Sequence, residues 1–175
     1  ILIVYLYKFA PDVLNSRGKL VLLCIIMTIV LMLAKFVAAY SLPGYIIPTA
    51  FASMLVAILM KPRLAIILNI PLSVFVTLTV GYNMDTFLVA LISGSAGALI
   101  LSRMQQRNDL ITAGAFVSLI NALTILGIGL INSAEILTVF EQSLLGIANG
   151  ALSSVFTLGV LPFCETIFDI VTPIK

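Results

Sequence analysis

Three asparagines stand inside long apolar stretches, where an amide side chain could bind a small polar ligand or join two helices. They are Asn69, Asn121 and Asn149. Burying an amide in an apolar environment is unfavourable unless its donors and its acceptor find partners. Hydrogen bonds between membrane helices contribute about 0.6 kcal/mol on average. Bonds that hold helices together are therefore the first interpretation, and a polar ligand cavity is the alternative.

Residue types that carry acid–base or metal chemistry are scarce in this chain. There is no histidine among its 175 residues, which excludes within them any His-based triad, His metal cluster or HD-type metal site. The two cysteines, Cys24 and Cys164, lie in or beside apolar segments and form no metal-ligand spacing. We therefore assign no catalytic, cofactor-binding or metal-ligating residue within the chain.

Composition indicates the class of protein. Apolar residues make up 62% of the chain and charged residues 9%, whereas soluble domains have about 45–50% and 25%. A water-soluble fold of this size could not bury so much apolar surface. The net charge is +2 and there is no long basic run, so nucleic acid is not an expected partner. The sequence predicts an all-α, polytopic transmembrane helical bundle whose main partner is the lipid bilayer.

The predicted spans follow from the thickness of the membrane. A bilayer core of about 30 Å needs roughly 20 apolar residues in a helix. The first apolar stretch begins at residue 1 without a basic leader, so we expect a truncated span and a chain that belongs to a longer protein. The seven predicted spans are residues 1–7, 20–40, 45–60, 64–82, 86–102, 110–131 and 137–161.

The basic residues predict the orientation, because cytoplasmic loops of membrane proteins carry an excess of Lys and Arg. With seven spans, every basic residue except Lys35 falls on one side. Lys35 lies near the end of its span, from which its side chain can reach the interface. The C-terminus is therefore predicted to be cytoplasmic. The basic residues of that side are Lys8, Arg17, Lys19, Lys61, Arg63, Arg103, Arg107 and Lys175.

Small residues form stripes in two of the predicted spans. Gly146 and Gly150 make a GxxxG pattern in the seventh span, and Gly94 and Gly97 lie in a run of small residues in the fifth. Such stripes let helix backbones approach closely in lipid. Packing within the bundle is the first interpretation, and a homodimer face is the alternative.

Prolines predict two irregularities. Pro71 should free a backbone carbonyl and kink the fourth span, and Pro162 should interrupt the seventh helix at the inner membrane surface. We therefore divide the chain into a transmembrane bundle, 1–161, and the start of a cytoplasmic connector, 162–175. Apolar residues at helical spacing after Pro162 predict that this connector is amphipathic. It could couple two domains or only tether them.

The last residues, GVLPFCETIFDIVTPIK, resemble the end of the membrane region in bacterial seven-transmembrane receptors with an intracellular HD phosphohydrolase domain. That family's pattern is a Gly and LPFFE, followed by F-x-I-x-T-x-x-K. Cys164 stands where Phe is usual, and Asp169 where Gly is usual. The stretches IIPTA in the third span and AGAFVSLINAL in the sixth extend the resemblance over nearly all of the chain. The matching positions are Leu161, Pro162, Phe163, Glu165, Phe168, Ile170, Thr172 and Lys175.

The resemblance implies that the chain is the membrane region of a signalling protein in the bacterial plasma membrane. An extracellular domain would precede the spans. A cytoplasmic HD domain would follow them, bind a divalent metal pair and hydrolyse cyclic di-AMP, with the metals activating the attacking water. The connector residues that would take part in coupling are Pro162, Phe163, Glu165, Phe168 and Thr172.

Two other functions remain open from the residues alone. A small membrane transporter, or a substrate-binding membrane subunit, would use a cavity lined by the span asparagines. The few charges inside the spans weigh against a proton or ion path. A membrane assembly module would instead use its glycine stripes to form dimers.

Overall fold

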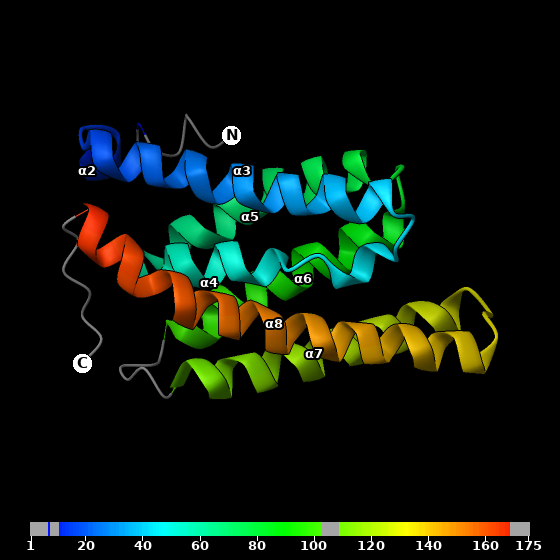
Figure 1. Cartoon of the computed structure of the whole chain (residues 1–175). Coiled ribbons are helices and arrows are strands. Elements are labelled where there is room, and N and C mark those ends of the chain that lie inside the picture. The colour runs from blue at the N-terminus through cyan, green and yellow to red at the C-terminus, as the bar shows by residue number, and fades with distance from the viewer. Residues whose placement is uncertain (1–6, 8–10, 103–108, 169–175) are drawn as a thin grey trace.

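The computed structural model describes residue 7 and residues 11–102 and 109–168, and its regular elements in these ranges are all helices (Figure 1). This arrangement confirms the predicted all-α class. The elements are α2 (Pro11–Leu14), α3 (Arg17–Ala39), the 3-10 helix η1 (Gly44–Ile46), α4 (Thr49–Leu59), α5 (Pro62–Thr79), α6 (Met84–Leu101), α7 (Asp109–Ile131) and α8 (Ile136–Phe168).

Five helices, α3, α5, α6, α7 and α8, are long and apolar enough to cross a membrane. They correspond to the predicted second, fourth, fifth, sixth and seventh spans. Large apolar side chains such as Phe36, Phe75 and Phe116 are exposed on their outer surfaces, as expected of helices that face lipid. The first predicted span, residues 1–7, lies outside the described residues except for Tyr7.

α4 is the innermost helix of the bundle. All of its residues, Thr49–Leu59, are buried, and it contacts α3, α5, α6 and α8. A helix that is apolar on nearly every side can be enclosed by other helices. Of the two hydroxyl groups of α4, Thr49 Oγ1 donates to Ala90 O at 3.4 Å, and Ser53 Oγ has no hydrogen-bond partner among the described residues. Its 11 residues give a length of about 16 Å, so α4 alone is shorter than the bilayer core.

Irregular backbone precedes α4, where the sequence predicts a continuous third span. η1 ends at Ile46, and Ile47 and Pro48 have non-helical dihedral angles before α4 begins. Non-helical backbone at membrane depth is tolerated where other protein groups bond to it. Tyr45 and Ile47 are both buried; Ile47 O accepts from Thr49 N at 2.8 Å, whereas the Tyr45 carbonyl needs a donor from elsewhere in the bundle.

Except for Lys35 in the last part of α3, the basic residues described by the structure gather at one end of the bundle. Figure 1 shows that α3 and α5 begin at this end and that α6 and α8 end there. Arg17 and Lys19 lie in the first turn of α3, and Lys61 and Arg63 lie at the start of α5. We call this the basic end of the bundle.

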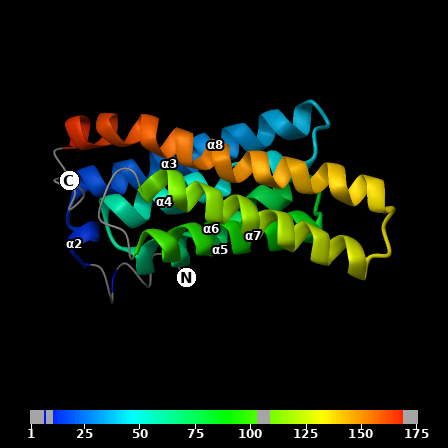
Figure 2. The ribbon, with the colours of Figure 1, turned by 90° about the horizontal axis from the view of Figure 1, so that it is seen from below.

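α7 and α8 form an antiparallel hairpin that extends beyond the other helices at the opposite end (Figures 1 and 2). The contact between these two helices is the most extensive in the bundle. Ile131 and Ile136, at the tip of the hairpin, are both exposed.

Both span prolines lie inside their helices. α8 runs without interruption through Pro162 to Phe168, so the prediction that Pro162 interrupts the seventh helix is wrong. The carbonyls that these prolines leave without a helical N–H donor are those of Leu158 and Ile67, four residues earlier, and the hydroxyl bonds nearby go to other carbonyls. Thr166 Oγ1 donates to Pro162 O at 2.9 Å. Near Pro71 in α5, Ser73 Oγ donates to Asn69 O at 2.8 Å.

Candidate functional site

α8 carries most of the residues that the sequence singles out. Its 33 residues give a length of about 50 Å, which exceeds a bilayer core of about 30 Å. α8 contacts α3, α4, α7 and η1. One continuous helix therefore connects the tip of the α7–α8 hairpin, the centre of the bundle and the basic end.

The GxxxG glycines of α8 pack against α7. A Cβ atom added to Gly150 would lie 2.6 Å from Ser118 Cα, and one added to Gly146 would lie 2.6 Å from Ile125 Cδ1. Ser118 Oγ also donates to Ile147 O at 2.8 Å across this interface. The glycines thus allow close approach of two helices of the same chain. Because α7 occupies this face, a homodimer through it is not supported.

Asn149 donates two hydrogen bonds to the irregular backbone before α4. Its Nδ2 donates to Tyr45 O at 2.6 Å and to Ile47 O at 2.8 Å. Its Oδ1 accepts a hydrogen bond of 3.2 Å from Ser153 Oγ. With every polar atom of its amide bonded, Asn149 joins the middle of α8 to the start of α4.

Asn69 and Asn121 each bond to the backbone of a neighbouring helix. Asn69 Nδ2 donates to Leu91 O on α6 at 2.8 Å, and Asn121 Nδ2 donates to Gly146 O on α8 at 3.3 Å. Both side chains are fully buried, and their Oδ1 atoms have no hydrogen-bond partner among the described residues. The three span asparagines thus join three different pairs of elements, which favours their interpretation as bonds between helices.

Gly94 and Gly97 allow α6 to lie close to its neighbours. A Cβ atom on Gly94 would collide with the Asn69 amide of α5. One on Gly97 would lie 2.9 Å from Met54 Cγ of α4. This stripe therefore faces the inside of the bundle, and the close approach at Gly94 brings Asn69 to the α6 backbone.

The predicted connector residues occupy the last turns of α8. Pro162 and Phe163 are exposed, and Glu165 is half-buried. Phe168 is the last helical residue, and the structure describes only its backbone. Thr172 lies outside the described residues.

Sequence reasoning missed the residues that attach this end of α8 to the bundle. Leu161 and Cys164 are buried on the side opposite the exposed connector residues. An apolar groove of about 220 Å³ separates this end of α8 from α3, with Leu22 and Ile26 among its lining residues. The apolar spacing of the sequence could have revealed this second, buried face of α8.

Polar contacts also tie the outer ends of the helices together. Asn132 Nδ2 donates to Asp85 Oδ2 at 3.2 Å, which connects the α7–α8 hairpin to the start of α6. In the part of the chain that the structure describes, no group of three His, Cys, Asp or Glu side chains could hold a metal ion.

Comparison with known proteins identifies the family. The family described as "7TM receptor with intracellular HD hydrolase" matches residues 1–172. The chain belongs to this family. The resemblance found at the end of the sequence is thereby confirmed, and the chain is the membrane region of a multi-pass membrane protein.

Two relatives carry the name cyclic-di-AMP phosphodiesterase PgpH. The protein from Bacillus subtilis (strain 168) is 29% identical over 99% of this chain and 26% of its own length. The protein from Listeria monocytogenes (serotype 1/2a, strain 10403S) is 30% identical over 74% of this chain and 18% of its own length. The chain thus spans about a quarter or less of these relatives. No solved structure matches it.

Proposed function

We propose that the chain is the sensor and anchor region through which an extracellular domain regulates a cytoplasmic HD-type phosphodiesterase acting on cyclic di-AMP. The family match over residues 1–172 supports this function, as do the names of the two relatives. The chain has no histidine, so the His and Asp ligands of a divalent metal pair would belong to the HD domain of the full-length protein.

In this proposal, α8 ends on the cytoplasmic side. The basic end of the bundle, with Arg17, Lys19, Lys61 and Arg63, is also the end at which α8 finishes. Short loops rich in Lys and Arg face the cytoplasm in membrane proteins. A domain that follows α8 would therefore lie inside the cell, where its substrate is.

The continuity of α8 through Pro162 is the observation that favours coupling over simple tethering. A helix without a break can carry a rotation or a shift from the outer hairpin to the basic end. A tether would need no fixed relation between the two ends. Coupling also requires that the helix adopt two arrangements of different energy.

Alanine insertions between Thr166 and Ile167 of the full-length protein test this function. One alanine turns everything beyond it by about 100°, whereas seven turn it by about 700°, within 20° of two full turns. We expect one alanine to change the rate of cyclic di-AMP hydrolysis at least about fivefold, a typical coupling effect. Seven should restore most of the original rate. Hydrolysis is measured in membranes and normalised to the amount of protein.

Two results would contradict the proposal in different ways. If the protein without an insertion does not hydrolyse cyclic di-AMP, the proposed activity is wrong. If the rates with zero, one and seven alanines are equal, the activity stands but α8 is only a tether.

A further inference from the structure

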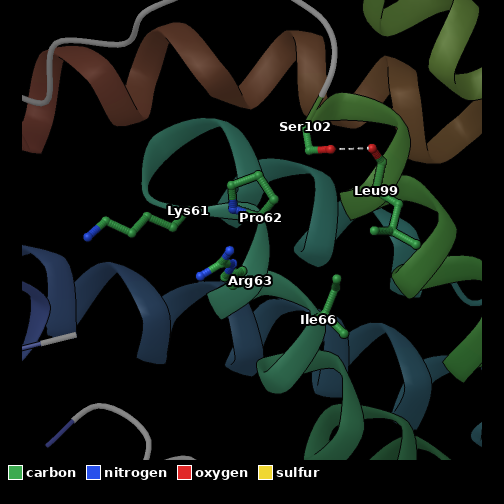
Figure 3. Close-up of a pocket in the computed structure, with 6 residues that line it drawn as sticks. All are labelled: Lys61, Pro62, Arg63, Ile66, Leu99 and Ser102. Carbon is green, nitrogen blue, oxygen red and sulfur yellow. Dashed lines mark hydrogen bonds between the residues drawn. The ribbon is translucent and has the colours of Figure 1, made fainter. Parts of the chain in front are cut away.

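A cavity of about 440 Å³ lies at the basic end, between the start of α5 and the end of α6 (Figure 3). Nothing in the proposed coupling function uses it. Its volume lies within the range of about 300–1,000 Å³ that is usual for small-molecule sites. The lining residues are Lys61, Pro62, Arg63, Ile66, Leu99 and Ser102.

The lining changes from charged to apolar along the helix axes. Lys61 and Arg63 lie at the start of α5, and both are exposed. Ile66 lies about one turn deeper along α5. On α6, Leu99 lies near the last residue of the helix, with 55% of its side chain exposed. Figure 3 shows the two basic side chains on one side of Pro62, with Ile66 and Leu99 on the other.

The charged part of the cavity suits a phosphate group. An arginine presents a fork of donors that matches phosphate oxygens, and a lysine adds a compact positive charge. No side chain caps the start of α5, so the positive end of its helix dipole adds to the potential there. Ser102 Oγ already donates to Leu99 O at 2.6 Å, and Lys61 and Arg63 are the basic groups of the lining.

A ligand with an anionic head and an apolar body matches this order of groups, and the inner leaflet of a membrane contains such molecules. Basic pockets between membrane helices on the cytoplasmic side bind anionic lipid headgroups. We propose that this cavity binds the phosphate-bearing headgroup of an anionic phospholipid, with an acyl chain along Ile66 and Leu99. This site rests on the orientation proposed above but not on the coupling function or on the identity of the cytoplasmic domain.

Native mass spectrometry of the full-length protein in detergent tests the site, with phosphatidylglycerol and phosphatidylcholine as probes. We expect the double substitution Lys61→Gln and Arg63→Gln to weaken phosphatidylglycerol binding roughly 30-fold, from two lost charges near the membrane surface. The matched control, Arg17→Gln with Lys19→Gln, removes the same charge from the same end of the bundle outside the cavity. It should change the affinity less than about twofold. Phosphatidylcholine binding should be unchanged in both variants.

Three outcomes would overturn the proposal. An unchanged affinity in the Lys61 and Arg63 variant would show that the cavity does not bind the headgroup. An equal loss in both variants would show a general surface attraction. Displacement of phosphatidylglycerol by millimolar glycerol 3-phosphate would show a site for a free anion.

If the double substitution does not yield folded protein, a second variant tests the same cavity. Leu99→Trp places an indole ring at the exposed, apolar side of the cavity. We expect it to lower the affinity for phosphatidylglycerol at least about fivefold, because a filled cavity excludes the acyl chain. An affinity equal to that of the unchanged protein would contradict the site.

Discussion

Replacing Gly150 by alanine should destabilise the bundle by about 1–3 kcal/mol, the usual effect of overpacking a tight interface. The added Cβ atom would lie 2.6 Å from Ser118 Cα. Backbone of α7 cannot turn aside as the end of a flexible side chain can, so the two helices must separate. Separation would also stretch the hydrogen bond from Ser118 Oγ to Ile147 O. The measurement uses full-length protein in which every cysteine except Cys164 has been replaced. Buried Cys164 reacts with maleimide once the bundle opens, so the temperature at which the reaction begins reports the stability of the bundle.

The matched control is Gly159→Ala on the same helix. No atom lies within 4 Å of a Cβ added to Gly159, and alanine favours a helix over glycine by up to about 1 kcal/mol. Gly150→Ala should therefore lower the temperature of Cys164 reaction, and Gly159→Ala should leave it unchanged or raise it. A similar fall in this temperature in both variants would mean that helix α8 itself, and not its contact with α7, determines the stability.

Replacing Asn149 by alanine should cost about 2 kcal/mol, roughly 1 kcal/mol for each of its two hydrogen bonds to backbone carbonyls. The buried Tyr45 O would then lose its donor on α8, and Ile47 O would keep only the hydrogen bond from Thr49 N. Cys164 reactivity on heating measures this change as well. Asn132→Ala is the control, because Asn132 is exposed and makes its hydrogen bond to Asp85 at the surface; we expect less than about 0.5 kcal/mol. Equal effects at the two positions would refute the role given to Asn149.

Length and hydropathy were sufficient to predict the long spans. α3, α5, α6 and α7 begin and end close to the predicted residues, because the thickness of the bilayer limits apolar helices from outside. Hydropathy could not predict which helices lie at the centre of the bundle. Lipid and protein neighbours are both apolar, so the composition of α4 could not show that every one of its residues is buried by other helices.

The hydrogen bonds between helices were only partly predictable. An amide inside a span indicates a bonding partner, and Asn69, Asn121 and Asn149 all have one. The partner of Asn149 at Tyr45 lies 104 residues away in the sequence, and the break in the backbone that requires it has no clear signature. The prediction for Pro162 was wrong for a different reason. The rule that proline interrupts a helix considers only the local backbone, and it ignores the packing of Leu161 and Cys164 that holds α8 in place.

The side of the membrane on which α8 ends is the central claim of this account, and a reporter fused after Lys175, behind all the preceding segments of the full-length protein, measures it directly. We predict that a green fluorescent protein fused there fluoresces and that alkaline phosphatase fused there is inactive, because both would lie in the cytoplasm. An active phosphatase together with a dark fluorescent protein would place this end outside the cell, and would contradict both the orientation of the bundle and its proposed link to a cytoplasmic hydrolase.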